Sequence, residues 1–267
     1  MTSISSRRIA LAIAVAVSAC GGRGRDAEPA PAAATPRPSV AYFHVDPATA
    51  GRIHGTVTYR GAKPAATMLL MSAEPTCEAI HKGKPVPDGQ LVVGPGGGLA
   101  NVFVYIKSGL QGKKFEPSKA PVVLDQEGCM FVPRVVGVQA GAPLAVRNGD
   151  PLEHNVHPGP KNNYEWNEGM APSGPDVIHK FARQEVMIRV KCNVHPWMRA
   201  WIGVVEHPYF AVTGADGTFE LTNVPPGDYT VAVWHEQFGE LTAPVALDAS
   251  STRTLGFAYP GSGEKEK

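Results

Sequence analysis

Apolar and polar residues alternate in short segments along most of this chain, a pattern that is typical of β-strands with one buried face. In residues 101–106, for example, Val102, Val104 and Ile106 fall on one side of an extended chain. The other segments with strand character are 52–59, 121–125, 135–138, 144–147, 186–191 and 201–206. No segment sustains a helical period over several turns, so long helices are not expected. The pattern predicts an all-β protein of many short strands.

The composition supports a fold with many turns. Glycine (29 residues) and proline (25 residues) are frequent in the chain of 267, and both favour turns over long helices. Hydrophobic residues make up 43%, which is enough to build a folded core. Lysine and arginine (25) almost balance aspartate and glutamate (24), so the charge gives no reason to expect a nucleic-acid partner. A β-sandwich or a barrel fits this composition.

The N-terminus has the features of an export signal. The Arg7–Arg8 pair precedes an apolar run over residues 9–17, which is shorter than the roughly 20 residues that cross a bilayer and fits the core of a signal peptide. The run ends in the letters VSAC. This ending resembles the lipobox of bacterial lipoproteins, which implies that residues 1–20 are a lipoprotein signal peptide and that Cys20 carries the lipid. An ordinary signal peptide with an incidental cysteine is the alternative.

The same resemblance implies a location. Gly21 rather than aspartate follows Cys20, which in bacterial lipoproteins favours the outer membrane, so we expect a lipid-anchored chain on the periplasmic side of a bacterial membrane. Residues 6–8 are also a partial twin-arginine pattern, so the export route stays open. Residues 21–50 are rich in alanine and proline and are expected to be a tether. Residues 261–267 are expected to be a disordered tail.

A second composition begins at residue 207. Residues 207–260 predict strands joined by tight turns, with a strong hairpin signal at Asp216–Gly217. The stretch DGTFELTNVPPGDYTVAV resembles the carboxypeptidase regulatory-like domain, a small β-sandwich of transthyretin type, and implies an architecture more than an activity. Residues 51–63 resemble the first strand of the same domain type. The region 51–117 is therefore either an N-terminal β region of its own or part of a discontinuous sandwich into which the central domain is inserted.

The strongest chemical signal is the segment KCNVHPWM at residues 191–198. It places a thiolate (Cys192), an imidazole (His195) and a thioether (Met198) at three-residue spacing. Soft sulfur ligands with imidazole suit copper, and two histidines, one cysteine and a weak axial methionine form blue copper sites. Zinc would prefer a closed set of cysteine and histidine without methionine. The segment lacks one histidine, which must come from elsewhere in the chain.

Two histidines upstream, His154 and His157, are candidates for the missing ligand. They belong to an HNVH element, and Asn148 precedes its first histidine by six residues. Together with the short KCNVHPWM segment, this element resembles the cupredoxins, and among them the amicyanins most closely, over residues 118–206. The resemblance implies a Greek-key β-sandwich that holds one type 1 copper ion.

The resemblance also implies roles for individual residues. The copper ligands would be His154, Cys192, His195 and Met198. His157 is the alternative first ligand, because residues three apart on a strand face opposite sides and cannot both reach one ion without a bend. Asn148 or Asn155 would supply hydrogen bonds that hold the ligand segment closed. His195 is expected to be the edge ligand, through which electrons would enter or leave.

Two positions depart from the family pattern. Glu153 stands where proline is common and Trp197 stands where phenylalanine is usual, which puts in question the polarity near the first histidine but not the ligand set. Four acidic side chains lie close in sequence to the first histidine, and we expect them to be solvated loop charges: Asp150, Glu153, Glu165 and Glu168. The alternative is that they form an acidic rim that binds a partner.

Cys77 and Cys129 remain once Cys20 and Cys192 are assigned to lipid and copper. An exported chain meets an oxidising compartment, in which pairs of thiols tend to form disulfides. We expect a Cys77–Cys129 disulfide that closes a loop of about 50 residues and stabilises the fold by roughly 4 kcal/mol. Two free buried thiols are the alternative.

These observations predict a membrane-anchored type 1 copper protein that transfers single electrons between a donor and an acceptor redox protein in the periplasm. Catalysis is not expected. A binuclear purple copper site needs two cysteines in the ligand loop, where only Cys192 is present, and a multicopper oxidase needs several His-x-His pairs, which the nine histidines do not form. Two alternatives stay open. One is a surface lipoprotein that binds or sequesters copper, and the other is an adhesion module in which copper is incidental.

Overall fold

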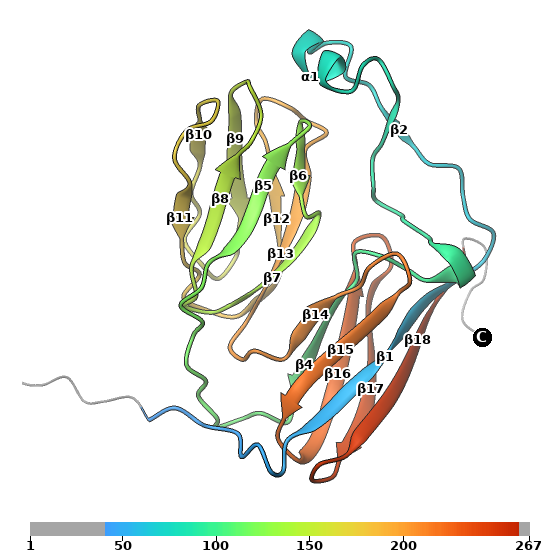
Figure 1. Cartoon of the computed structure of the whole chain (residues 1–267), viewed down its shortest axis with the longest axis vertical. Helices are drawn as coiled ribbons and strands as arrows, with labels where there is room; N and C mark the ends of the chain where they lie inside the picture. Colours follow the sequence, from blue (N-terminus) through green and yellow to red (C-terminus); the bar gives the residue numbers. More distant parts are fainter. Residues whose placement is uncertain (1–40, 262–267) are drawn as a thin grey trace, which may run out of the picture. The chain divides into compact units, whose positions relative to one another are not determined.

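The computed structural model describes residues 41–261, which form an almost entirely β structure (Figure 1). The all-β fold class is confirmed. One short helix, α1 (Pro75–Ile80), and one 3-10 turn, η1 (Pro95–Gly97), interrupt the strands. Among these residues, no helix is long and apolar enough to cross a membrane. The expected signal peptide with Cys20 and the greater part of the expected tether lie outside the described residues.

One sandwich, called here the terminal sandwich, combines strands from both ends of the described chain. Its sheets have the orders β15–β1–β18 and β14–β4–β16–β17. The strands are β1 (Gly51–Arg60), β4 (Phe103–Ser108), β14 (Phe210–Val212), β15 (Thr218–Val224), β16 (Gly227–His235), β17 (Gly239–Leu247) and β18 (Thr252–Pro260). Because β4 ends at Ser108 and the next strand of this sandwich, β14, begins at Phe210, the sandwich is discontinuous in sequence.

Strand β1 shows how its sequence pattern builds the terminal sandwich. Ile53, Val57 and Tyr59 are buried in alternation with more exposed residues, as the two-residue period of a strand demands. They enter a core that also holds Leu221 of β15 and Val231 of β16. On one side β1 pairs antiparallel with β15, and on the other it pairs parallel with β18. The strand is therefore central in its sheet.

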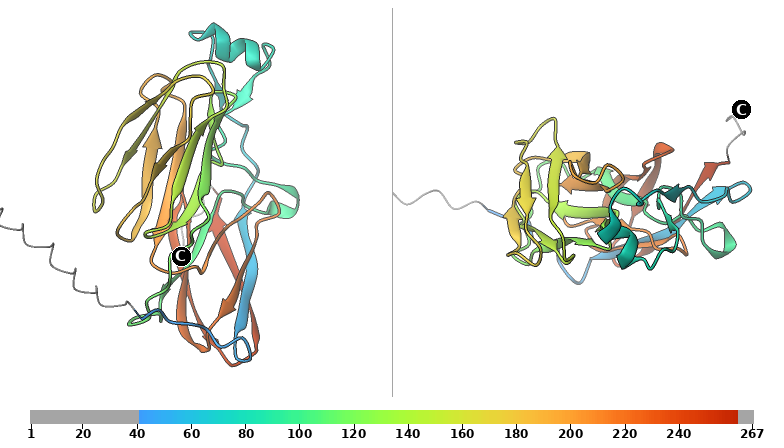
Figure 2. Two further views of the ribbon diagram at one scale, coloured as in Figure 1. Left: turned by 60° about the vertical axis from the view of Figure 1, so that its left-hand side comes forward. Right: turned by 90° about the horizontal axis from the view of Figure 1, so that it is seen from above.

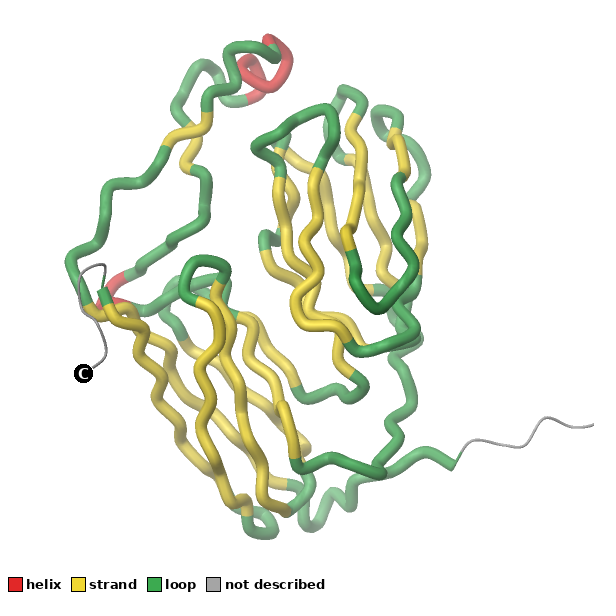
Figure 3. Tube along the Cα trace, turned by 180° about the vertical axis from the view of Figure 1, so that it is seen from behind, coloured by secondary structure: helices red, strands yellow, loops and turns green. Residues whose placement is uncertain are grey.

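The strands between β4 and β14 form a second sandwich, called here the central sandwich. Its sheets have the orders β10–β9–β12–β13–β7 and β11–β8–β5–β6. The strands are β5 (Val122–Glu127), β6 (Met130–Val132), β7 (Val135–Gln139), β8 (Leu144–Asn148), β9 (His154–Gly159), β10 (Glu168–Met170), β11 (Val177–His179), β12 (Glu185–Lys191) and β13 (Arg199–Val205). Strands make up the body of both sandwiches, and loops join them at their ends (Figures 2 and 3).

A small apolar cluster joins the two sandwiches. Phe103 of β4 packs with Val135 of β7 and Val205 of β13. Gly203 makes room for the Phe103 ring, because a Cβ added at Gly203 would lie only 2.5 Å from that ring. Glycine is therefore a packing requirement at this position of β13.

A buried ion pair lies beside this cluster. Arg134 donates a hydrogen bond of 2.9 Å from its Nη2 to Oε2 of Glu236, and both side chains are 9% exposed. The indole nitrogen of Trp201 donates a second hydrogen bond to the same oxygen, at 3.2 Å. A buried charge pair of this kind depends on both partners, because either charge alone would be desolvated without compensation.

A long excursion leaves the terminal sandwich between β1 and β4. Residues 64–92, called the cap below, contain α1 and the antiparallel pair β2 (Met68–Leu69) and β3 (Val86–Pro87). Pro75 lies in the first turn of α1, where a missing backbone N–H costs nothing. The sequence pattern did not predict α1, because a six-residue helix is too short to show a helical period.

Candidate metal centre

A short loop between two paired strands carries three of the expected ligands. Strands β12 and β13 are antiparallel neighbours, and Lys191 at the end of β12 pairs with Arg199 at the start of β13. The residues between them, 192–198, are called the metal loop below. Its two ends therefore lie side by side, and the strands fix the positions of Cys192 and Met198.

Backbone hydrogen bonds hold the metal loop in a compact turn. The N–H of Cys192 donates to the oxygen of Met198 at 3.3 Å, and the N–H of Met198 donates to the oxygen of His195 at 3.0 Å. The N–H of His195 donates to Sγ of Cys192 at 3.4 Å, and an accepting sulfur favours the thiolate. Pro196 further restricts the backbone. The loop thus orients sulfur and imidazole through contacts of the protein alone.

His154 reaches the metal loop from a neighbouring strand. It is the first residue of β9, which pairs with β12. Its Nδ1 lies 3.0 Å from Nδ1 of His195, and Sγ of Cys192 lies 3.8 Å from the same nitrogen of His195. The three ligand atoms all lie within 4.8 Å of one another. Residues from two separate parts of the chain therefore converge on one point.

The residues at this point fit a copper ion. Two imidazole nitrogens 3.0 Å apart can share one ion, because metal–imidazole bonds are about 2.0 Å long in zinc sites. His154, Cys192, His195 and Met198 are each at most 3% exposed, and one core cluster contains both sulfur residues. A set of thiolate, thioether and two imidazoles is softer than the oxygen sets of magnesium and calcium and matches copper.

A carboxylate stands behind His154. Nε2 of His154 donates to Oδ2 of Asp150 at 2.8 Å, and the N–H groups of Gly128 and Cys129 donate to the same carboxylate at 2.7 Å each. Burial alone would raise the pKa of Asp150, but these hydrogen bonds outweigh it and lower the pKa. An ionised Asp150 holds the proton on Nε2 of His154, which leaves Nδ1 to face the ligand cluster.

The electrostatics of the metal-free site favour a charged sulfur. Burial lowers the pKa of His154, but hydrogen bonds to Asp150 and Cys192 raise it to about 8. Burial raises the pKa of Cys192, yet hydrogen bonds from His154 and from the N–H of His195 lower it overall. Burial and the neighbouring charge of His154 both lower the pKa of His195. The metal-free site therefore offers a thiolate at Cys192 and a neutral His195, while charged His154 must release a proton when a metal ion binds.

The two candidate asparagines have different partners. Oδ1 of Asn155 accepts a hydrogen bond of 3.0 Å from the N–H of Asn193, which lies in the metal loop. Nδ2 of Asn148 donates to the oxygens of Leu152, Met170 and Ala171 at 2.9–3.1 Å. Asn155 thus holds the metal loop to β9, while Asn148 shapes the turn that leads to His154.

His157, the alternative first ligand, lies outside the cluster of ligand atoms. It faces the opposite side of β9, where its Nε2 lies 2.6 Å from Glu165 and its Nδ1 lies 3.3 Å from Asn193.

The other cysteines form the expected disulfide, between Cys77 of α1 and Cys129 of the β5–β6 turn. Within the described residues, Cys192 is the free cysteine.

One expectation about exposure is wrong. Asp150 is not a solvated loop charge, because it is 4% exposed and bonded to His154. His195, the expected edge ligand, is 1% exposed. The only sequence signal for Asp150 was its position four residues before His154, and this signal does not say which of several nearby acidic residues turns inward.

Comparison with known families identifies the C-terminal part of the chain. Residues 201–259 match the carboxypeptidase regulatory-like domain. The regulatory-like match begins in β13 of the central sandwich and continues through β14, β15, β16 and β17 into β18. Strands β1 and β4 lie outside the match and complete the regulatory-like sheets. No curated protein matches the chain.

Solved structures of copper proteins are similar to part of the chain. A Cu-containing nitrite reductase from Thermus scotoductus SA-01 matches at 20% identity with a TM-score of 0.31, over 36% of this chain and 24% of that chain. A purple cupredoxin from Nitrosopumilus maritimus matches at 18% identity with a TM-score of 0.27, over 32% and 98%. An amicyanin variant in the Cu(I) state matches at 20% identity with a TM-score of 0.29, over 33% and 86%. The chain thus spans about a quarter of the nitrite reductase.

Proposed function

We propose that this chain is a type 1 copper protein that carries single electrons between redox partners. The observation that carries the proposal is the convergence of Nδ1 of His154, Nδ1 of His195 and Sγ of Cys192 within 4.8 Å of one another in a buried site. Met198 is fully buried in the same core cluster as Cys192 and supplies the thioether. Copper held by such ligands supplies one-electron chemistry, since it is stable in two oxidation states.

The role of the protein in this proposal is to hold the ligands still. Cys192 and Met198 are fixed at the ends of two paired strands, and Asn155 ties the loop between them to β9. Asp150 orients the ring of His154 through Nε2. Ligands locked in this way move little when the charge of the site changes, and such rigidity suits a carrier. No catalytic step forms part of this proposal.

We also propose a location and partners. A lipid on Cys20 would anchor the chain to the periplasmic side of a bacterial membrane, and Gly21 favours the outer membrane. The support is the VSAC ending after an apolar run. A donor and an acceptor redox protein would then exchange electrons with the chain at the end of its tether.

Titration of the purified chain with Cu(II) tests the metal assignment. We expect one equivalent to bind and to produce the intense visible thiolate-to-copper absorption of a blue site. Cys192→Ser and His154→Gln should each abolish this band. His157→Gln is the matched control and should keep the band, because His157 faces away from the cluster. A wild-type chain that binds one copper ion without the band would contradict the proposal.

Two rates then separate an electron carrier from a copper store. Stopped-flow mixing of the copper-loaded chain with a small inorganic redox complex gives the rate of electron exchange. Incubation with a copper chelator gives the rate of metal loss. Fast, reversible electron exchange with slow metal loss supports the carrier. Rapid metal loss with slow electron exchange would instead favour a lipoprotein that stores copper.

A further inference from the structure

One edge of His195 is covered although the residue belongs to a loop. Nδ1 of His195 faces His154 and Cys192, so Nε2 points away from the ligand cluster. This Nε2 is buried and has no hydrogen-bond partner among the described residues. Loops run over the protein surface and their side chains normally meet water. Another part of the chain must therefore exclude water from this edge.

A buried cluster that includes cap residues lies beside the metal loop. Met71 and Cys77 of the cap form a buried cluster with Cys129, and Trp197 of the metal loop packs against it. The indole nitrogen of Trp197 also donates a hydrogen bond of 3.0 Å to the backbone oxygen of Cys129. His195 precedes Trp197 by two residues, and their rings lie 5.2 Å apart. The cap therefore contacts the metal loop directly beside the covered histidine.

The helix of the cap also contacts the central sandwich. His81 follows α1 directly, and its Nε2 lies 2.7 Å from the backbone oxygen of Gly128 in the turn between β5 and β6. Cys77 within α1 is bonded to Cys129 of the same turn. Two neighbouring contacts thus hold α1 against the central sandwich.

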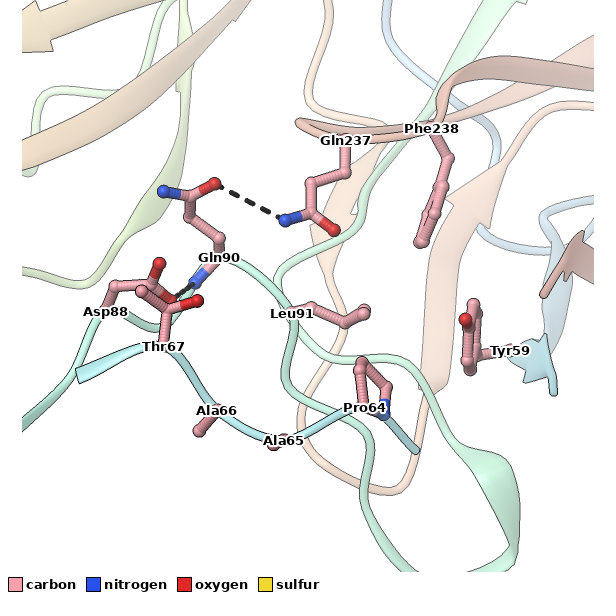
Figure 4. Close-up of a pocket in the computed structure, with 10 residues that line it drawn as sticks. All are labelled: Tyr59, Pro64, Ala65, Ala66, Thr67, Asp88, Gln90, Leu91, Gln237 and Phe238. Carbon is pink, nitrogen blue, oxygen red and sulfur yellow. Dashed lines mark hydrogen bonds between the residues drawn. The ribbon is translucent and has the colours of Figure 1, made fainter. Parts of the chain in front are cut away.

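The cap has few other attachments. Across residues 64–92, all of which the structure describes, Met71 and Cys77 are the only buried residues. Near the end of the cap, Arg134 donates a hydrogen bond to the backbone oxygen of Asp88 at 2.6 Å, and Gln237 donates one to Gln90 at 3.3 Å. A cavity of about 400 Å³ lies between the two ends of the cap and the terminal sandwich, and Figure 4 shows the residues that line it. The apolar contacts of the cap with the central sandwich gather around the Cys77–Cys129 bond, where Leu69, Ile80 and Val86 are partly buried, so this bond fixes the position of the cap.

We propose that the cap is a lid, locked by the Cys77–Cys129 disulfide, that closes the histidine edge of the metal centre against solvent and small reagents. The lid rests on the proposed function only for the identity of the ion beneath it. Its closure is a property of the metal-free chain as well, because the covering contacts involve protein atoms alone. Electrons that pass to a partner would then leave through a surface other than the His195 edge.

The test measures access to Cys192 in the metal-free full chain. Cys192 is 3% exposed and lies 3.8 Å from His195, so an alkylating reagent reaches it when the lid opens. The rate of iodoacetamide labelling is followed by mass spectrometry of the peptide that contains Cys192. We expect Cys77→Ser/Cys129→Ser to label about tenfold faster than wild type, because local opening becomes easier without loss of the fold.

A matched control uses two exposed positions of the same cap. Met68 and Leu70 are 49% and 84% exposed, so Met68→Ser/Leu70→Ser should label at the wild-type rate. Circular dichroism and a cooperative thermal transition establish that each variant is folded. Equal labelling of wild type and the folded Cys77→Ser/Cys129→Ser variant would overturn the lid.

A second variant decides the question if the first does not fold. Met71→Ala keeps the disulfide and removes the cap side chain that is buried in the cluster beside Trp197. Faster labelling of Cys192 in this variant supports the lid, and an unchanged rate overturns it. Because copper is absent throughout, failure of the blue copper assignment and failure of the lid give different results.

Discussion

The carboxylate of Asp150 accepts a hydrogen bond of 2.8 Å from Nε2 of His154, four residues further along the chain. The same carboxylate accepts the backbone N–H of Cys129, which is one half of the disulfide. One buried acidic side chain thus connects His154 of the candidate metal centre to the disulfide that joins the cap to the central sandwich. Hydrogen bonds behind a ligand orient it and raise its basicity.

Replacement of Asp150 by asparagine should weaken copper binding. Asp150→Asn keeps the shape of the side chain and removes the negative charge that fixes the tautomer of His154. We expect copper affinity to fall about 10- to 100-fold, the usual effect of losing such a partner. Competition titration against a chelator of known affinity measures this change. Asp176→Asn is the control, because Asp176 pairs with Arg147 at the surface, and it should leave the affinity as in wild type.

The raised pKa of His154 should make the stability of the metal-free chain depend on pH. The pKa of this histidine is 6.5 when the chain is unfolded and about 8 in the folded protein. Charged His154 therefore stabilises the fold fully below the unfolded pKa, and this contribution is lost as the pH rises through the folded pKa. A shift of this size corresponds to about 2 kcal/mol.

Urea unfolding of wild type and His154→Gln isolates this contribution. The difference in free energy of unfolding between the two should be larger near pH 6 than near pH 9, by about 2 kcal/mol. A wild-type curve parallel to that of His154→Gln would contradict the prediction.

Loss of the buried charge on Glu236 should destabilise the fold. Glu236→Gln leaves Arg134 buried beside a neutral partner, and we expect the free energy of unfolding to fall by about 3–5 kcal/mol. Chemical denaturation measures the change. The exposed pair Glu116 and Lys119, 3.7 Å apart, supplies the control, since Glu116→Gln should cost less than about 1 kcal/mol. Similar losses in both variants would show that burial of the pair contributes nothing.

A single methyl group at Gly203 should disturb the contact between the two sandwiches. The added Cβ of Gly203→Ala would lie 2.5 Å from the buried Phe103 ring, and overpacking of this kind costs about 1–3 kcal/mol. Gly256→Ala in β18 is the matched control, because no atom lies within 4 Å of its added Cβ. The melting temperature of the first variant should fall, and that of the second should stay or rise. A tolerated Gly203→Ala would mean that the Phe103 ring shifts freely.

The sequence predicted most strands because a half-buried strand shows its alternation locally. The stretches 52–59, 121–125 and 186–191 all became strands with bounds within two residues of those expected. The short helix α1 was missed, since six residues show no period. The burial of Asp150 was also missed, because nothing in a single sequence distinguishes it from Glu153, which is exposed.

The sequence by itself determined the chemistry that the chain can offer. The spacing of Cys192, His195 and Met198 indicates a ligand set for a soft metal. The three donors are so close along the chain that one short loop brings them together, regardless of the rest of the fold. The tertiary structure alone decided which histidine joins them, since the two faces of β9 direct His154 inward and His157 outward. It also decided that the cluster of Met71, Cys77 and Cys129 packs beside Trp197 of the metal loop, because contacts between distant segments depend on how the chain folds back and leave no local pattern in the sequence.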